Sequence, residues 1–185
     1  MKMLPHPVLI TGRLILRPYE TGDFEAVHAY ASIPEVSQYM DWGPNTTENT
    51  RDFVARCVDA AQSWQETGFF FAVVRKDDNR LIGGCDMSAE RGATREGGIG
   101  YCLHPDFWGR GYMTECAEAL LKLGFEEMKW RRITSFCDPD NIGSWRVMEK
   151  VGMRREGHER EAKWFKGRWH DWLKYAILDH EWKGR

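Results

Sequence analysis

A chain of 185 residues is the size of one ordinary domain, long enough to bury most of the surface that its unfolded form exposes. Its formal net charge of −2 gives no electrostatic support for a nucleic-acid or membrane-surface role. The longest strongly apolar run, residues 69–74, is far too short to span a bilayer, and the N-terminal residues lack the apolar core of a signal peptide. We therefore expect a cytoplasmic protein.

The cysteines predict neither a disulfide framework nor a zinc site, because they are odd in number and none has CxxC spacing. They are Cys57, Cys85, Cys102, Cys116 and Cys137. We expect reduced thiols and no bound metal.

The first third of the chain predicts one strand followed by helices. Residues 13–17 form a β-prone run that Pro18 stops. Thr21 is positioned to cap a helix that runs to about Ala31, and a short helical piece follows from Pro34. Thr46 or Thr47 can cap a third helix that ends at Gly68. The apolar face expected for it consists of Phe53, Cys57, Ala60, Ala61 and Trp64.

The remainder alternates strands with helices. Residues 69–74 and 81–87 predict a hairpin, and residues 98–103 a third strand. A helix then runs to about residue 128, followed by a strand at 133–137 and a helix that Gly152 closes. Two final strands are expected at 154–163 and 169–178. Because no repeat or linker interrupts this order, we expect a single mixed α/β domain over residues 1–185.

The first chemically informative segment is residues 101–117. A strand stops at Pro105, Gly109 and Gly111 permit a tight loop, and a helix begins at once. Backbone N–H groups at such a helix start form an anion site, to which Arg110 can add charge. A plain tight turn gives the same pattern. The glycine spacing fits neither a Walker loop nor a Rossmann fingerprint.

The second informative segment is residues 138–153, where a polar turn follows a strand. Asn141 and Ser144 stand at the start of the next helix, where both types are common capping residues. The functional interpretation is that both face a ligand at the end of the strand. The residues alone leave both interpretations open.

Together the two segments resemble a known family. Residues 108–116 are similar to the pyrophosphate loop of GNAT acetyltransferases. Asn141, Ser144, Val147, Lys150 and Gly152 resemble the NxxSxxVxxKxGF signature of its RimJ/RimL branch, the ribosomal-protein N-terminal acetyltransferases. The runs at 11–18 and 82–84 also look like that branch, so the resemblance spans about residues 10–180.

The resemblance implies the GNAT fold, a mixed and mostly antiparallel sheet flanked by helices. The strands at 98–103 and 133–137 would splay apart, with the cosubstrate acetyl-CoA between them. Backbone amides of residues 108–113 would hold its pyrophosphate, and residues 101–103 would pair with the pantetheine arm. An amide near Leu103 or His104 would polarise the thioester carbonyl, a contribution of about 3 kcal/mol. The expected cosubstrate-binding residues are Tyr101, Cys102, Leu103, Trp108, Gly109, Arg110, Gly111, Tyr112, Met113, Thr114, Asn141, Ser144 and Lys150.

One position departs from the family pattern. Asp106 stands where Gln or Arg is frequent, and an acidic group there is unhelpful to pyrophosphate unless it points away. The backbone amides and Arg110 would then have to suffice.

The chemistry implied is direct attack of a neutral amine on the thioester. An α-amino group has a pKa near 8 and a lysine near 10.4, so an N-terminal amine needs less help to lose its proton. We expect Ser144 to protonate the leaving thiolate and Glu96 to act as base, with Glu159 and Glu161 as alternatives. The glutamate of the RimL-like pattern aligns with Lys163. His104 and Cys102 are interpreted as structural.

The expected function is therefore acetylation of a protein or peptide N-terminus by a monomer or homodimer. The first alternative is acetylation of a small amine, such as an amino acid, polyamine or antibiotic. The second is a binding module that senses acetyl-CoA without turnover, and release of CoA with any amine would exclude it.

Overall fold

The computed structural model describes residues 6–62, 68–90 and 95–184, and the strands and helices in these ranges form a mixed α/β fold. The hydrogen-bonded order of the strands is β1-β2-β3-β4-β5-β6-β8-β7. By their internal contacts the residues divide into two compact units, 1–88 with 101–112 and 89–100 with 113–185. Each unit is described by itself, and the single-domain organisation stays a prediction.

The first unit contains an antiparallel run of four strands. They are β1 (Leu9–Ile10), β2 (Leu14–Pro18), β3 (Phe69–Arg75) and β4 (Leu81–Ala89), with the end of β5 (Glu96–Leu103) beside β4. The predicted hairpin of β3 and β4 is confirmed, with Phe71 opposite Cys85. The two-residue strand β1 was not predicted, because a run that short carries no period.

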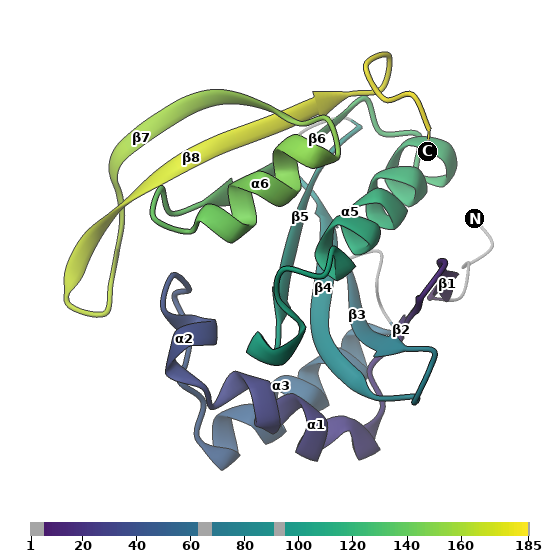
Figure 1. The fold of residues 1–185 in the computed structure, drawn as a ribbon, viewed down its shortest axis with the longest axis vertical. Coiled ribbons are helices and arrows are strands. Elements are labelled where there is room, and N and C mark those ends of the chain that lie inside the picture. The colour runs from purple at the N-terminus through teal and green to yellow at the C-terminus, as the bar shows by residue number, and fades with distance from the viewer. Residues whose placement is uncertain (1–5, 63–67, 91–94, 185) are drawn as a thin grey trace. The chain divides into compact units, whose positions relative to one another are not determined.

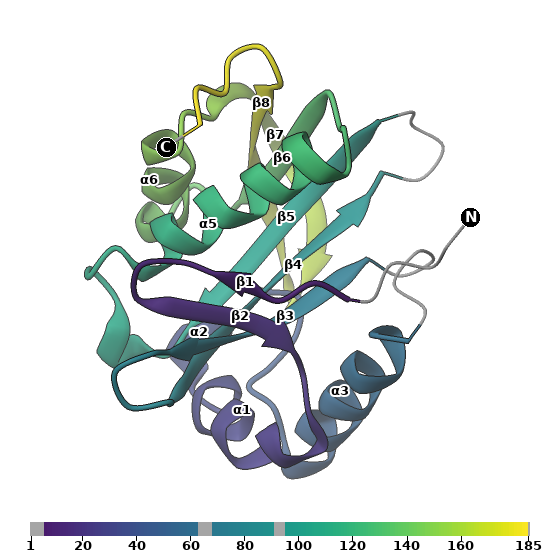
Figure 2. The ribbon, with the colours of Figure 1, turned by 90° about the vertical axis from the view of Figure 1, so that its right-hand side faces the viewer.

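The helices of the first unit cover one face of these strands (Figure 2). They are α1 (Phe24–Ala31), α2 (Pro34–Ser37) and α3 (Thr47–Ala60), preceded by the 3-10 turn η1 (Thr21–Asp23). Their apolar side chains meet those of β3 and β4 in one buried cluster that includes Val27, Val54 and Ala72. Burial of this face, at about 25 cal/mol per Å² of apolar surface, holds the helices on the sheet.

Helix starts were predicted with mixed success. Thr46 caps α3 as expected, because its hydroxyl accepts from the Asn49 amide at 3.2 Å. Thr21 is not the cap of the first helix, because Glu20 and Asp23 form a capping box around η1 instead. The buried face of α3 is also rotated from the expected one and consists of Thr50, Val54, Cys57 and Ala60, while Trp64 lies outside the described residues.

The second unit contains the start of β5, β6 (Arg132–Cys137), β7 (Arg154–Phe165) and β8 (Arg168–Leu178), in the order β5-β6-β8-β7. β7 and β8 form the long green-to-yellow hairpin in Figure 1. Helix α5 (Tyr112–Lys122) continues as a π-helical turn (Leu123–Glu127), and α6 (Ile142–Lys150) follows β6. The predicted buried face of α5 is confirmed: Met113, Ala117, Leu120, Leu121 and Phe125 are all buried.

β5 and β6 pair in parallel, whereas β8 pairs antiparallel with both β6 and β7. The parallel ladder ends at Gly98 and Thr134, although β5 continues to Leu103 and β6 to Cys137. Immediately beyond the ladder the Ser135 hydroxyl donates to the Ile99 carbonyl at 2.9 Å. The predicted fold class, a mixed and mostly antiparallel sheet with flanking helices, is confirmed. No helix in the described ranges is long and apolar enough to cross a membrane.

Candidate active site

The loop from Trp108 to Tyr112 belongs to the first unit, where it follows η2 (Pro105–Phe107) and ends at the first residue of α5. Gly109 and Gly111 have φ of 72° and 77°, the left-handed region where a side chain is strained. Within the part of the chain that the structure describes, the amides of residues 109–111 donate to no protein acceptor. A Cβ on Gly109 would meet nothing within 4 Å, so there is open space beside this glycine. The loop therefore fits an anionic group, as the glycine pattern predicts.

Two aromatic residues and one arginine hold this loop in place. Arg13 donates to the Arg110 carbonyl at 3.0 Å, and its guanidinium lies 4.4 Å from the centre of the Tyr112 ring. The Trp108 indole donates to the Leu103 carbonyl at 2.7 Å, which ties the loop back to the end of β5. Trp108 and Tyr112 were predicted to bind the cosubstrate, and in the structure their side chains also hold the loop in position.

A cluster of arginines lies behind the loop around the buried ring of Phe107. The guanidinium carbons of Arg75, Arg80 and Arg110 lie 5.1, 5.1 and 5.8 Å from its centre. Asp78 pairs with Arg75, and this ion pair lowers the pKa of Asp78 to about 2. The remaining positive charge favours an anion beside the loop.

Asp106, the position that departs from the family pattern, is engaged with His104. The imidazole Nδ1 of His104 accepts from the Asp106 amide at 3.2 Å and lies 3.7 Å from its carboxylate. His104 therefore caps the 3-10 turn, which agrees with its structural interpretation. The His104 amide donates to the Ile82 carbonyl at 2.8 Å, so it is engaged and does not supply the free amide expected near this position.

In the second unit, the turn between β6 and α6 is built by side chains. The Asn141 side-chain oxygen accepts from the Ser144 amide at 3.2 Å and caps α6, as its capping interpretation predicts. The Ser144 hydroxyl hydrogen-bonds the Cys137 thiol, while burial raises the pKa of that thiol to about 11. Asn141 and Ser144 thus stand together at the end of β6, one turn of helix apart.

A buried imidazole–carboxylate pair supports this turn. His170 on β8 and Asp138 lie 2.8 Å apart, with side chains 1% and 6% exposed. Asp138 also accepts from the Asp140 amide at 3.0 Å, and the ring of Phe165 stacks on His170 at 3.6 Å. The Nε2 atom of His170 is buried without a hydrogen-bond partner among the described residues. Sequence reasoning missed this pair, because a strand 32 residues away supplies the histidine.

The predicted base, Glu96, lies at the start of β5 in register with Arg132 on β6. Its carboxylate is 3.9 Å from the Arg132 guanidinium, which also pairs with Glu156. The alternatives Glu159 and Glu161 are exposed on β7. Glu96 is therefore held in a surface ion-pair network, where its charge is partly compensated.

The other predicted positions are spread along the two segments. Tyr101 is half-buried on β5, Met113 and Thr114 lie in the first turn of α5, and Lys150 is exposed at the end of α6. Leu103 is buried on β5. In the described residues, no three His, Cys, Asp or Glu side chains gather in a way that could hold a metal ion.

Residues 13–154 match the family model described as an acetyltransferase (GNAT) domain. The chain is 38% identical over 176 residues to the uncharacterized N-acetyltransferase YnaD of Bacillus subtilis, which covers 94% of this chain and 98% of that protein. It is 24% identical over 119 residues to the [ribosomal protein uS5]-alanine N-acetyltransferase of Escherichia coli, covering 64% and 61% of the two chains.

Solved structures of acetyltransferases are also similar to this chain. A GNAT-family acetyltransferase from Bacillus anthracis superposes with a TM-score of 0.86 at 38% identity, covering 95% of this chain and all of that one. The microcin C7 self-immunity acetyltransferase MccE, solved with acetyl-CoA and AMP, has a TM-score of 0.80 at 19% identity over 95% and 97% of the two chains. The second likeness is one of fold.

Proposed function

This chain belongs to the GNAT acetyltransferase family and is an acetyl-CoA-dependent N-acetyltransferase, and we propose that its acceptor is the α-amine at the N-terminus of a protein or peptide. The observation that supports this choice of acceptor is the similarity to the alanine N-acetyltransferase of ribosomal protein uS5. The pKa of an α-amine, near 8, also makes it a less demanding substrate than a lysine. The proposal takes residues 1–185 as one cytoplasmic catalytic domain of the RimJ/RimL type, whose five cysteines are all unpaired thiols.

The proposal assigns the pyrophosphate of acetyl-CoA to the loop at 108–113. The support is the pair of left-handed glycines, the unengaged amides of residues 109–111 and the positive charge of Arg110. The remaining cosubstrate residues are Tyr101, Cys102, Leu103, Thr114, Asn141, Ser144 and Lys150. Of these, Asn141 would bind the pantetheine arm through its amide nitrogen, since its oxygen caps α6.

Catalysis then requires one group to take the amine proton and another to protonate the leaving thiolate. We assign the second role to Ser144, whose hydroxyl already hydrogen-bonds a sulfur atom, that of Cys137. Sequence reasoning offers Glu96 for the first role, and Glu96→Gln tests it directly. Positioned proton transfer of this kind contributes about 100- to 10,000-fold to a rate.

The acceptor is tested by following acetyl-CoA-dependent thiol release with Ala- and Ser-starting peptides, free amino acids, polyamines and aminoglycosides. We expect release with the peptides and none when their N-termini are blocked, with mass spectrometry placing the acetyl group on the α-amine. Release with small amines alone would overturn the N-terminal assignment and support the small-molecule alternative.

The role of Ser144 can be tested with a matched control at Cys137, its hydrogen-bond partner. Ser144→Ala should lower kcat about 10- to 100-fold if the hydroxyl protonates the thiolate. Cys137→Ala removes the same hydrogen bond from the other side and should leave kcat within about twofold. Equal losses in the two variants would show that Ser144 serves only the packing of the turn.

A further inference from the structure

A carboxylate that sequence reasoning passed over, Asp86, lies half-buried in the middle of β4, opposite Phe70 on β3. Among the described residues it makes no hydrogen bond and no ion pair. A carboxylate in such surroundings is costly unless a proton or a cation compensates its charge. The protein therefore keeps an uncompensated acid on an inner strand of the first unit.

The position of Asp86 is fixed by the strand and by the helices that pack on it. Side chains two apart on a strand share a face, so Asp86 points to the same side as Gly84. A Cβ on Gly84 would collide with the hydroxyl of Tyr19, which lies 3.3 Å from the hydroxyl of Tyr30 on α1. Asp86 thus faces the side of the sheet that the helices cover.

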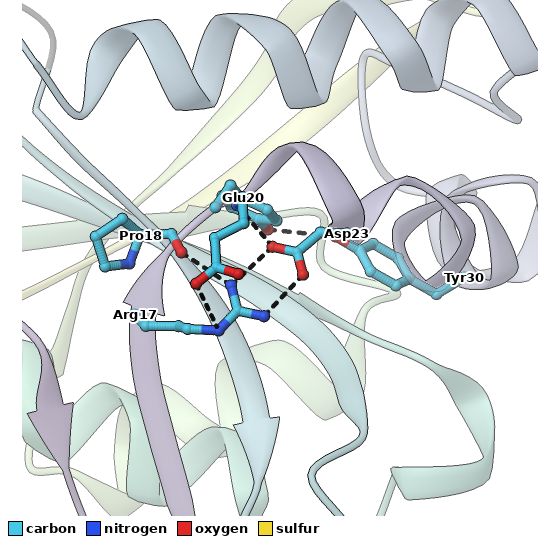
Figure 3. Close-up of polar contacts among 6 residues, drawn as sticks. Arg17, Pro18, Glu20, Asp23 and Tyr30 are labelled. Atoms are coloured by element: carbon cyan, nitrogen blue, oxygen red, sulfur yellow. Dashed lines mark hydrogen bonds and ion pairs between the residues drawn. The ribbon is translucent and has the colours of Figure 1, made fainter.

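The turn that carries Tyr19 is itself rigidly held (Figure 3). Arg17 donates to the two oxygens of Asp23 at 2.8 and 2.7 Å, and the Asp23 carboxylate also accepts from the Glu20 amide at 2.8 Å. Such a paired guanidinium–carboxylate contact fixes geometry as well as charge. The phenol groups beside Gly84 therefore have defined positions.

The titratable neighbours of Asp86 stay neutral. The hydroxyl of Tyr30 hydrogen-bonds the thiol of Cys102 on β5, and Asp86 interacts electrostatically with Cys102 and with Cys57 on α3. Burial raises the pKa of both thiols to about 12 and raises that of Tyr19 and Tyr30 well above 10. Arg56 on α3 is an exposed cation that interacts electrostatically with Cys57. Of Asp86 and these four neutral groups, only Asp86 changes charge near neutrality.

We propose that Asp86 binds the ammonium group of the acceptor and takes its proton before the attack on acetyl-CoA. This inference rests on the proposed function, because it takes residues 101–103, which include Cys102, as the strand that binds the pantetheine arm. One N–H bond of the ammonium breaks and its proton moves to a carboxylate oxygen of Asp86. The free amine then forms the C–N bond, the C–S bond breaks, and the second proton lost from nitrogen reaches the CoA thiolate. Asp86 finally releases its proton to water.

The environment of Asp86 suits this step better than that of Glu96. A carboxyl group with an ordinary pKa near 3.9 is a weak base toward an amine whose pKa is near 8. Burial raises the pKa of Asp86 to about 6, which makes its carboxylate a stronger base while leaving it ionised at pH 7. Glu96 instead lies in an ion-pair network, with its carboxylate 3.9 Å from the Arg132 guanidinium and its side chain 42% exposed.

The test compares Asp86→Asn, Glu96→Gln and a surface control, Asp52→Asn on α3, with whichever amine of the panel the wild type acetylates fastest. Asp86→Asn should lower kcat at least 100-fold and leave the Kd for acetyl-CoA unchanged. The wild-type kcat/KM should fall below a pH of about 6, and this acid limb should be absent in Asp86→Asn. The control variant Asp52→Asn should keep kcat within about threefold and retain the limb.

The outcomes separate this inference from the acceptor assignment. Turnover of small amines but not peptides would overturn the N-terminal assignment, and the Asp86 variants would still be tested on those amines. An Asp86→Asn enzyme within threefold of wild type, or a large loss in Glu96→Gln alone, would overturn the role of Asp86. Asp86→Glu, which keeps the carboxylate, should recover part of the rate and so distinguishes chemistry from a folding defect.

Discussion

The loop at residues 108–112 and the turn at residues 138–144 both follow a strand and both lead into a helix, yet they are built from different atoms. The loop offers backbone amides, and its shape depends on two glycines in the left-handed region. The turn offers side chains, and its shape depends on Asp138, which a distant histidine holds. A site made of backbone is sensitive to glycine replacement, whereas a site made of side chains is sensitive to the loss of one buried partner.

The largest effect is expected where the turn depends on its buried pair. Asp138→Ala leaves His170 buried without its partner and removes an acceptor of the turn, which should cost about 3 kcal/mol of unfolding free energy. Urea unfolding measures this. Asp140→Ala, two residues away and exposed, is the control and should cost less than about 0.5 kcal/mol. A loss below about 1 kcal/mol in Asp138→Ala would mean that the turn does not depend on this pair.

A smaller effect is expected where the loop depends on backbone conformation. Gly111→Val puts a branched side chain at a φ of 77°, at a strain of about 1–3 kcal/mol. The Kd for acetyl-CoA, measured by calorimetry, should therefore rise about 10- to 100-fold. Gly167 at the tip of the β7–β8 hairpin has a φ of 78°, so Gly167→Val introduces the same strain away from the loop. Equal Kd values in the two variants would contradict a role for the loop in binding.

The ionisation of Asp86 should change how the free energy of unfolding depends on pH. Its folded pKa, about 6, lies above the usual 3.8, so its stabilising contribution is full below pH 4 and is lost as the pH rises through 6. The difference corresponds to at most about 3 kcal/mol, and partial exposure should reduce it to about 1 kcal/mol. Asp86→Asn should therefore gain about 1 kcal/mol over wild type between pH 4.5 and pH 8 in urea unfolding. A constant difference across this range would show that Asp86 ionises normally.

The smallest effect concerns single exposed charges in the two regions. Arg110→Gln should raise the Kd for acetyl-CoA about threefold at low salt, because one exposed charge near an anion contributes about 0.3–1 kcal/mol. The effect should shrink as ionic strength rises. Lys150→Gln removes an exposed positive charge of the second unit, at the end of α6, and is tested in the same way. A Kd that is insensitive to salt in wild type and Arg110→Gln alike would remove Arg110 from the site.

Local signals predicted much of the fold. An apolar run bounded by turn residues predicted the β3–β4 hairpin, and two final strands were expected where β7 and β8 lie. Helical spacing predicted the buried face of α5. The face of α3 was predicted less well, because Thr50 is buried there and a polar residue is not counted in an apolar stripe. The capping box at Glu20 was also missed, because Thr21 is a more familiar cap than a glutamate.

The candidate site was predictable only where one short segment forms it. Gly109 and Gly111 predicted the loop, because their spacing can be seen in the sequence. His170, Arg13 and Arg75 could not be found in this way, since they come from parts of the chain far from the turn and the loop that they contact. Asp86 was overlooked for another reason. A single acid in an apolar strand has no motif, and only its burial and its neighbours distinguish it.

The five buried or half-buried cysteines have a practical consequence for assays of this enzyme. Disulfide reagents react with thiolates, and burial holds the pKa of Cys57 and Cys102 at about 12 and that of Cys137 at about 11. Colorimetric detection of free CoA at pH 8 should therefore have little background from the native protein. A slow rise in reactive thiol without added amine would then report unfolding, so the same reagent can monitor both turnover and the integrity of each variant.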